Sequence, residues 1–254
     1  MNMRVLAFHD DRGVLTIELN RPEVRNALLP DMLGRVADVL GENRKNPSVR
    51  VVVLAGAGAS FCAGGDANAM PGDFHTAWNA LTRLMMEFRE YPKPIIARVQ
   101  GHAIGIGCSL ALASDFVVAE SGARFEWPFV KMGLVPEATQ MALRCMPASM
   151  LRTFALLGEP MTGKVLAEAK VIHAAVDPGH LATAVEELIE RLLSLPDFGI
   201  AAIKQSLETA STLPLQDSLQ WEGQRQLEIR SSPEFSAFRK KYFERAGVKT
   251  KDAK

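Results

Sequence analysis

The chain has 254 residues, 48% of them hydrophobic, which is enough to bury a large core in one domain or in a domain with a helical appendage. Lysine plus arginine equal aspartate plus glutamate at 29 each, so the balance of charge carries no signature of binding to nucleic acid or to an anionic membrane surface. Three widely spaced cysteines without a metal-ligand pattern, an N-terminus without the apolar core of a signal peptide and the absence of a membrane-length apolar run predict a cytoplasmic protein that holds no metal.

Strand and helix patterns alternate along the first half of the chain. Residues 13–19 alternate apolar and polar side chains, as a half-buried strand does, and Asn20-Arg21-Pro22 ends the pattern. Apolar side chains at helical spacing then predict a helix from Pro30 to a stop at Asn46-Pro47. Further strands are predicted at 49–55, 95–99, 115–119 and 123–125, with helices at 74–91 and 110–113. This alternation predicts α/β layers joined by right-handed crossovers.

Helices dominate after Pro136. Short helices are predicted at 141–146, 149–157 and 162–169, and a late strand at 171–176. From Gly179 onward prolines separate a series of helices, at Pro196, Pro214 and Pro233. Large apolar side chains, such as Trp221 and Phe238, indicate that this C-terminal section packs against another surface, for example a neighbouring subunit.

Two glycine-rich stretches each follow an apolar strand: residues 60–67, Ser-Phe-Cys-Ala-Gly-Gly-Asp-Ala, and residues 101–108, Gly-His-Ala-Ile-Gly-Ile-Gly-Cys. Each is compatible with an ordinary turn from strand to helix. Glycine also lets the main chain approach a ligand closely, and two N–H groups aimed at one carbonyl oxygen form an oxyanion hole. Neither stretch matches the dinucleotide or phosphate-loop fingerprint, which disfavours nucleotide binding.

Few titratable side chains lie near these stretches. Asp66 is placed to cap a helix, and His102 to make a structural hydrogen bond. Cys62 has no recognisable base beside it. Glu137 follows Pro136 and is expected in the first turn of a helix, where either helix stabilisation or catalysis explains a carboxylate.

Five segments in this order resemble the enoyl-CoA hydratase/isomerase, or crotonase, family over residues 5 to 245: Arg21-Pro22 with Arg25-Asn26-Ala27-Leu28, Phe61 to Asp66, Gly101 to Gly107, Asp115, and Pro128 to Glu137. The resemblance implies an α/β fold with a spiral core of repeated ββα units in residues 1–190. It also implies a C-terminal helical region in residues 191–254 that serves oligomerisation, as a homotrimer or a hexamer built from two trimers.

Acyl-CoA thioesters are the substrates that the resemblance implies, with no separate cofactor because coenzyme A is part of the substrate. The N–H groups of Gly65 and Ile106 would hold the thioester oxygen. The residues implied to line the substrate are Arg25, Ala27, Ala63, Asp66, Ala67, Asn68 and Phe129.

Departures from the family pattern bear on the reaction. Hydratases of the family use two glutamates to hold and activate a water, and the matching positions here are Ser109 and Phe129. Glu137 instead matches the single catalytic carboxylate of the peroxisomal type of Δ3,Δ2-enoyl-CoA isomerase. We therefore expect Glu137 to move a proton from C2 to C4 of a 3-enoyl-CoA while the two amides hold the dienolate. An apolar surround with Phe129 is expected to raise the pKa of Glu137.

Three other reactions of the family remain alternatives: those of a hydratase, a dienoyl-CoA isomerase and an acyl-CoA hydrolase. A dehalogenase is disfavoured, because Glu137 is longer than the aspartate used there and Val130 stands where its histidine is expected. A non-catalytic acyl-CoA-binding protein is a further alternative, since Gln140 and Met141 replace small residues after Glu137. No lysine-rich helix supports an RNA-binding role.

Overall fold

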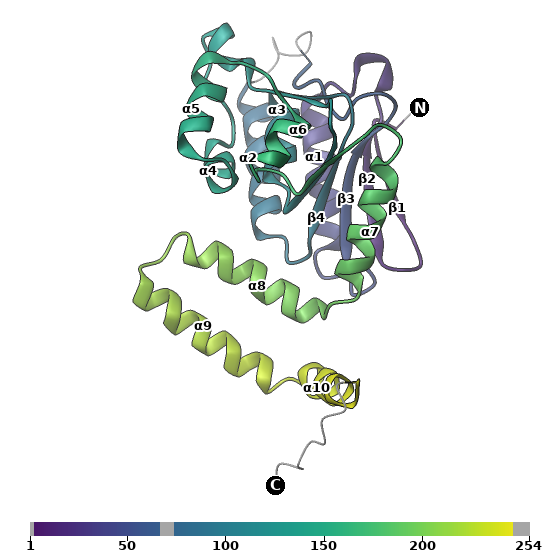
Figure 1. Cartoon of the computed structure of the whole chain (residues 1–254), viewed down its shortest axis with the longest axis vertical. Helices are drawn as coiled ribbons and strands as arrows, with labels where there is room; N and C mark the ends of the chain where they lie inside the picture. The colour runs from purple at the N-terminus through teal and green to yellow at the C-terminus, as the bar shows by residue number, and fades with distance from the viewer. Residues whose placement is uncertain (1–2, 67–73, 246–254) are drawn as a thin grey trace. The chain divides into compact units, whose positions relative to one another are not determined.

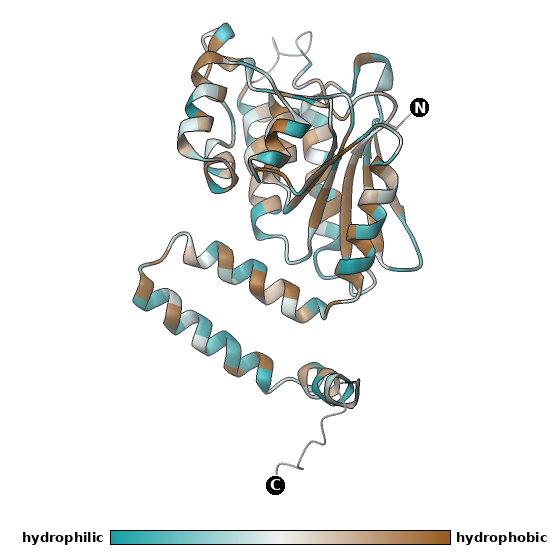
Figure 2. Ribbon diagram, viewed as in Figure 1, coloured by the Kyte–Doolittle hydropathy of each residue, from teal (hydrophilic) through white to brown (hydrophobic). Residues whose placement is uncertain are grey.

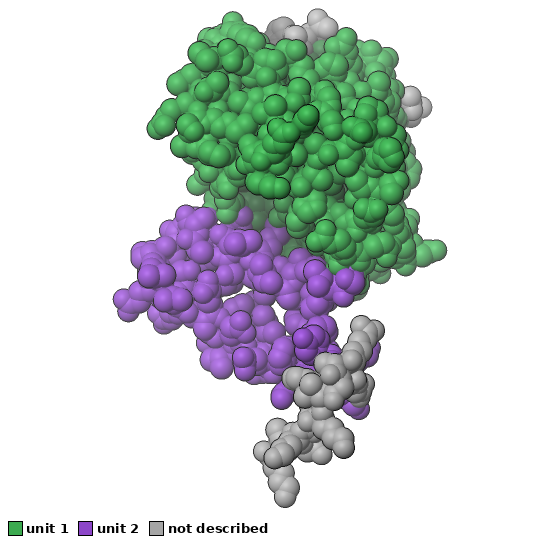
Figure 3. Space-filling view, in the orientation of Figure 1, with its two compact units in different colours: residues 1–193 green, residues 194–254 purple. Residues whose placement is uncertain are grey.

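A six-stranded sheet forms the centre of the first of two units in the computed structural model, which describes residues 3–66 and 74–245 (Figure 1). The first unit comprises residues 1–193 and the second residues 194–254 (Figure 3). In spatial order the strands are β1 (Val5–His9), β2 (Val14–Leu19), β3 (Val51–Gly56), β4 (Ile95–Val99), β6 (Phe116–Glu120) and β9 (Ala174–Val176).

Parallel pairing dominates this sheet. Only the β1–β2 pair is antiparallel, and each of the other neighbours is parallel. A parallel neighbour requires a crossover, and α1 (Pro30–Asn43), α2 (Phe74–Glu90) and α3 (Ile106–Ala113) lie in three of them. All six residues of β3 are buried, as expected for a strand covered on both faces. The predicted α/β layering is therefore confirmed.

Helices cover both faces of the sheet. α1 and α2 pack against each other on one face, and α7 (Leu181–Leu193) lies over the other (Figure 1). Figure 2 shows hydrophobic residues concentrated in the strands between these layers. The core continues beyond the sheet into a group of fully buried aromatic side chains: Phe61, Tyr91, Phe125, Trp127 and Phe154.

A second, three-stranded sheet lies beside the main one. It consists of β5 (His102–Ile104), β7 (Arg124–Glu126) and β8 (Met161–Thr162), with β5 parallel to β7. Strand β5 falls inside the second glycine-rich stretch, which the sequence presented as a turn. Three residues are too few for a periodic pattern, so only the pairing with β7 reveals the strand.

Short helices fill the rest of the first unit. They are the 3-10 helices η1 (Pro22–Val24) and η2 (Pro128–Met132), and the α-helices α4 (Thr139–Cys145), α5 (Ala148–Leu157) and α6 (Gly163–Glu168). The hydroxyl of Thr162 caps α6 by accepting a hydrogen bond from the Val165 N–H at 3.3 Å.

The second unit contains α8 (Asp197–Ala210), α9 (Leu215–Arg230) and α10 (Pro233–Arg245). Prolines mark all three starts: Pro196 and Pro214 are N-caps, and Pro233 is the first residue of α10. The predicted division by prolines is thus confirmed. None of the helices in the described ranges combines the length and the apolar character needed to cross a bilayer.

Candidate active site

The two glycine-rich stretches lie side by side and exchange main-chain hydrogen bonds. Cys62 forms a parallel bridge with Ala103 of β5. Its N–H donates to the carbonyl of His102 at 2.8 Å, and its own carbonyl accepts from the Ile104 N–H at 2.9 Å. Stretches separated by about forty positions in the sequence numbering are therefore neighbours in space through the fold alone.

A third segment, residues 25–28, holds the first stretch from its other side. The Ala63 N–H donates to the carbonyl of Arg25 at 2.9 Å. Leu28 donates to the carbonyl of Gly64 at 2.7 Å and accepts from the Asp66 N–H at 2.9 Å. Residues 63–66 are consequently held on both sides by backbone hydrogen bonds, which leaves little freedom for their own N–H groups to reorient.

The N–H groups of Gly65 and Ile106 have no acceptor among the described residues. Ile106 is the first residue of α3, where N–H groups have no partner within the helix. Gly105 precedes it with φ +53° and turns the chain into the helix. A Cβ atom on Gly65 would lie 3.6 Å from Cδ1 of Ile106, so the two residues are close neighbours. N–H groups without a protein acceptor are available to donate hydrogen bonds to an oxygen atom of a ligand.

Glu137 lies on the loop between η2 and α4, with its main chain tied to α3. The Ser109 hydroxyl donates a hydrogen bond to the Glu137 carbonyl at 3.0 Å. The expected place in the first turn of a helix is wrong: α4 begins at Thr139, because Ala138 adopts a left-handed conformation with φ +59°. Glu137 is therefore a loop residue and its carboxylate is not needed for a helix end.

The carboxyl group of Glu137 is largely withdrawn from water. Its Oε2 atom is buried and finds no hydrogen-bond partner among the described residues. Burial raises the pKa of Glu137 to about 7, against a smaller opposing effect of a hydrogen bond from its own backbone. A carboxylic acid with this pKa can both accept and return a proton near neutral pH.

The two positions that matched the hydratase glutamates carry no acid. Ser109 is buried in α3, and its Oγ atom accepts a hydrogen bond from Nε1–H of Trp127 at 3.2 Å. Phe129 is buried in η2, with its ring edge-on to Trp127 at 6.3 Å. A Cβ atom on Gly105 would lie 3.7 Å from Cζ of Phe129, so this ring lies against the start of α3. These two positions therefore offer a hydroxyl group that is already hydrogen-bonded and an apolar ring.

The carboxylate of Asp66 forms an ion pair, whereas the helix start that it was expected to cap falls on residues 67–73, outside the described residues. Nη1 of Arg21 lies 2.9 Å from Oδ2 of Asp66, and both side chains are largely buried. The same nitrogen donates to the carbonyl of Ala27 at 2.7 Å. This pair therefore fastens residues 25–28 to the first glycine-rich stretch.

Asn26 is a structural residue that sequence reasoning did not single out. It is fully buried with φ +58°, and its side-chain amide donates to the carbonyls of Ala57 and Ser60 at 2.9 and 2.7 Å. Its side-chain oxygen accepts from the Arg21 N–H at 2.9 Å. Asparagine tolerates this left-handed conformation better than most residues, and this preference is the feature of the sequence that could have pointed to Asn26.

The remaining predicted substrate-binding residues fall into two groups. Arg25 is exposed, with φ +52°, while Ala27 and Ala63 are half-buried. Ala67 and Asn68 lie outside the described residues.

Glu126 is a second residue that the sequence did not reveal. Its carbonyl accepts the Gly105 N–H at 2.9 Å, and its buried carboxylate binds Arg124 at 2.7 Å and Lys131 at 2.8 Å. Burial alone would raise the pKa of Glu126, but the hydrogen bonds from Lys131 and Arg124 lower it overall. Glu126 therefore links two parts of the site: its carbonyl binds the turn before Ile106, and its carboxylate binds Lys131 of η2.

The other titratable candidates have structural roles. Nδ1 of His102 lies 3.1 Å from the Ser60 hydroxyl, which confirms the predicted structural hydrogen bond. Cys62 is fully buried, and its burial raises the pKa of the thiol to about 12, so it is no nucleophile near neutral pH. In the described ranges no three histidine, cysteine, aspartate or glutamate side chains gather as a metal site would require.

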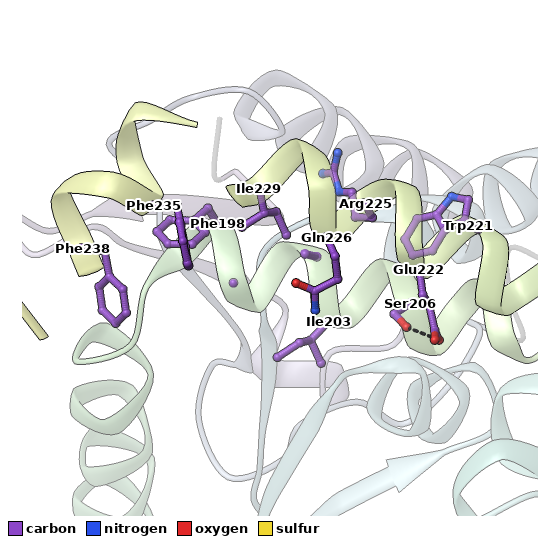
Figure 4. A pocket seen from close by; sticks show the side chains of 12 residues that line it. Phe198, Ile203, Ser206, Trp221, Glu222, Arg225, Gln226, Ile229, Phe235 and Phe238 are labelled. Carbon is purple, nitrogen blue, oxygen red and sulfur yellow. Dashed lines mark hydrogen bonds between the residues drawn. The ribbon is translucent and has the colours of Figure 1, made fainter. Parts of the chain in front are cut away.

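A cavity of about 390 Å³ is lined entirely by residues of the second unit and by none of the site residues above (Figure 4). Aromatic rings of Phe198, Phe235 and Phe238 line it together with Trp221. Ser206 donates to Glu222 at 2.9 Å along its wall (Figure 4). A shallower hollow follows the acidic face of α7, where Arg12 pairs with Glu186 and Glu190.

Comparisons with known proteins agree on one family. A profile described as enoyl-CoA hydratase/isomerase matches residues 9–252. The chain is 33% identical over 233 residues to 1,2-epoxyphenylacetyl-CoA isomerase of Escherichia coli K12, covering 87% of this chain and 88% of that protein. It is also 33% identical over 227 residues to 2,3-dehydroadipyl-CoA hydratase of the same strain, covering 87% and 89%.

Solved structures give the same picture. An enoyl-CoA hydratase from Polaromonas sp. JS666 superposes with a TM-score of 0.82 at 30% identity, covering 89% of this chain and 91% of that one. An enoyl-CoA hydratase from Mycobacterium smegmatis superposes with a TM-score of 0.87 at 26% identity, covering 94% and 97%.

Proposed function

The chain belongs to the enoyl-CoA hydratase/isomerase family, and on that premise we propose that it shifts the double bond of a 3-enoyl-CoA to the conjugated 2-position. One observation carries the choice of reaction: of Ser109, Phe129 and Glu137, only Glu137 has a carboxyl group. This group has a buried oxygen without a hydrogen-bond partner among the described residues, and its pKa is raised to about 7. Membership alone does not select the reaction, since the relatives include an isomerase and a hydratase.

Proton transfer by one carboxylate is sufficient for this isomerisation. Glu137 removes a proton from C2 of the acyl group, and the electron pair moves onto the thioester oxygen to form a dienolate. The free N–H groups of Gly65 and Ile106 donate hydrogen bonds to that oxygen. The protonated Glu137 then returns its proton at C4, so that the enzyme ends in its starting state. Proton transfer of this kind contributes roughly 10²–10⁴-fold to a rate, and each oxyanion donor a further 10²–10³-fold.

The neighbours of Glu137 support isomerisation over hydration. A hydratase must hold and activate a water molecule on its substrate. Ser109 donates its hydroxyl proton to the Glu137 carbonyl and accepts from Trp127, so it has no proton left to donate, and a hydroxyl does not act as an acid or base as a carboxyl group does. The Phe129 ring has no group that can transfer a proton.

The thioester would lie with coenzyme A along residues 25–28 and the first glycine-rich stretch. Arg25, Ala27, Ala63 and Asp66 come together there through the main-chain and ion-pair contacts described above. Ala67 and Asn68 continue the same stretch of sequence. Phe129 would face the acyl group. No separate cofactor enters this proposal, because coenzyme A arrives with the substrate.

The proposal includes self-association, as a homotrimer or as two trimers. The second unit leaves many apolar side chains exposed, among them Ile203 and Leu207 on α8 and Leu215 on α9, at 64%, 66% and 76%. Exposed apolar surface of this kind is typical of an interface.

The deciding experiment follows thioester absorbance as trans-3-enoyl-CoA substrates of short, medium and long chain become conjugated. Glu137→Gln is run beside the wild type, with Glu159→Gln as a matched control at an exposed glutamate. We expect turnover in the wild type and the control and its loss in Glu137→Gln. Full turnover by Glu137→Gln would overturn the assignment.

Two further readouts separate the alternatives. Exchange of C2 or C4 protons with deuterated water, dependent on Glu137, distinguishes an enzyme from a protein that only binds acyl-CoA. Addition of water to a 2-enoyl-CoA, or release of free coenzyme A, without isomerisation would replace the proposal by hydratase or hydrolase activity.

A further inference from the structure

The Ser109 side chain connects the two halves of the site. Ser109 lies in the first turn of α3, three residues after Ile106, and is 1% exposed. Its Oγ atom lies 3.0 Å from the carbonyl oxygen of Glu137 and 3.3 Å from that of Gly105. The hydroxyl thus touches both the loop that carries the carboxyl group and the turn that aims the Ile106 N–H.

Trp127 restricts where the hydroxyl proton can point. Its Nε1–H donates to Oγ of Ser109 at 3.2 Å, so the proton of the hydroxyl is directed away from the indole and toward a carbonyl. The indole is itself fully buried and packs against Phe129 and Phe154, at ring separations of 6.3 and 5.6 Å. A rigid aromatic group therefore orients the Ser109 hydroxyl.

We propose that Ser109 is a positioning residue: its hydroxyl, oriented by Trp127, holds the main chain of Glu137 at a set distance from the oxyanion donor Ile106. This inference rests on the proposed function for its catalytic meaning, but the positioning itself is a property of the free protein. Ser109 stands where the resemblance places a hydratase glutamate, but in this chain it would support Glu137 and would not activate a water molecule.

The hydrogen bond from Ser109 to the main chain of Glu137 matters because Glu137 lies in no helix or strand that would hold it in place. Ala138 is left-handed and α4 starts only at Thr139. At the side-chain end, the carboxyl oxygen Oε2 has no hydrogen-bond partner among the described residues, and the hydrogen bond that the group does accept comes from the backbone of Glu137 itself. Loss of the Ser109 hydrogen bond would therefore let the loop move outward and expose the carboxyl to water.

Charged side chains on the neighbouring elements do not explain how the carboxyl group is held. Helix α3 carries no charged residue. Lys131 of η2 binds Glu126, Arg89 of α2 donates to Gln140, and Arg144 of α4 already has a partner. The environment of Glu137 thus depends on burial, and burial depends on the position of its loop.

The test is a titration of Glu137 in the free protein, followed through the ¹³C shift of labelled glutamate carboxyl carbons, with Glu137→Gln identifying the signal. Ser109→Ala removes the hydroxyl. Ser114→Ala is the matched control, because that serine is the C-cap of α3 and its hydroxyl also donates to a main-chain carbonyl, that of Leu110 at 3.1 Å, without reaching Glu137. We expect the proton affinity of Glu137 to fall at least about tenfold in Ser109→Ala and to be unchanged in the control.

A folded Ser109→Ala protein whose Glu137 titrates as in the wild type would overturn the proposal. Should Ser109→Ala fail to fold, Trp127→Phe decides, because it removes the indole N–H and frees the hydroxyl to rotate. We expect a smaller shift in the same direction, and an unchanged titration of that variant would count against the proposal.

Kinetics add a readout that general loss of stability would not move. We expect kcat for isomerisation to fall about 10- to 100-fold in Ser109→Ala while KM stays nearly constant, because the thioester contacts remain and only the acid is displaced. A rise in KM alone would contradict the positioning role. If the wild type showed no isomerase turnover but Ser109→Ala still shifted the titration of Glu137, the proposed function would be refuted and the positioning role of Ser109 would stand.

Discussion

Gly65 and Ile106 are close neighbours from two separate stretches of chain: a Cβ atom added to Gly65 would lie 3.6 Å from Cδ1 of Ile106. The contact follows from the bridge between Cys62 and Ala103, which aligns the two glycine-rich stretches. The N–H groups of both residues have no acceptor among the described residues, and under the proposed function they bind the thioester oxygen together.

Ile106→Pro removes one donor and leaves the fold in place. Ile106 is the first residue of α3, and proline is well tolerated at that position because its missing N–H has no partner in the helix. We expect turnover of the acyl-CoA substrate to fall about 10²–10³-fold with little change in melting temperature. Ile106→Ala keeps the N–H and is the control, expected within a few-fold of wild type. Equal activity of the two variants would show that this N–H is not used.

Glu137→Gln is expected to abolish activity and to stabilise the protein above neutral pH. Burial raises the pKa of Glu137 from its ordinary value of 4.5 to about 7, so the folded state binds the proton more tightly than the unfolded state. Between these two values the free energy of unfolding therefore falls as pH rises, and the whole destabilising contribution, on the order of 1–3 kcal/mol, is present above pH 7.

Urea denaturation of wild type and Glu137→Gln near pH 5 and near pH 8 measures this effect. The stability difference in favour of the variant is expected to grow with pH. The same titration predicts that kcat/KM of the wild type declines below about pH 7, where the carboxylate that removes the C2 proton becomes protonated. A stability difference independent of pH would mean that Glu137 is ionised as in water.

Gly64→Ala is expected to disturb the first glycine-rich stretch. Gly64 has φ +99°, and an added Cβ would lie 2.9 Å from the main-chain oxygen of Ile104, which cannot move without breaking the pairing with Cys62. We expect a loss of about 1–3 kcal/mol in the free energy of unfolding, with a large loss of activity. Gly122→Ala is the control, since its Cβ would meet nothing within 4 Å. Thermal melts measure the stability and initial rates measure the activity. If Gly64→Ala changed neither, the close approach of residue 64 to the Ile104 oxygen would be refuted.

Self-association is expected through the second unit. Light scattering after size exclusion should give three or six times the 27.7 kDa mass of the chain. Ile203→Asp combined with Leu207→Asp places charges on exposed apolar positions of α8 and is expected to give smaller species. Phe8→Asp, at a residue of β1 that is 51% exposed, is the control in the first unit. A monomeric wild type would contradict the proposed trimer.

Much of the fold was predictable from local patterns. The apolar runs of β3 and β4, the helical spacing of α1 and α2 and the prolines of the second unit all appear in the structure close to their predicted bounds. These elements are long enough for periodicity to identify them. Strands β1, β5 and β8 were not predicted, and β5 and β8 have only three and two residues, which are too few to show a period.

The candidate site divides in the same way. Motif order drew attention to Gly65, Ile106 and Glu137, since glycine-rich turns and a carboxylate after proline are visible in the sequence. The misplaced start of α4 shows the limit of that reasoning. Pro136 and Glu137 have the composition of a helix start, but Ala138 is left-handed and delays the helix.

Local patterns in the sequence were enough to predict the longer helices, most of the strands and the residues available for acid, donor and apolar roles, because each of these depends on neighbours within a few positions. The packed chain was needed to show that Gly65 lies near Ile106, that Asp66 pairs with Arg21 and that Ser109 holds the main chain of Glu137. These contacts join residues from 28 to 45 positions apart. The pKa of Glu137 depends in turn on burial by such distant residues, and burial is a property of the packed chain rather than of any local pattern.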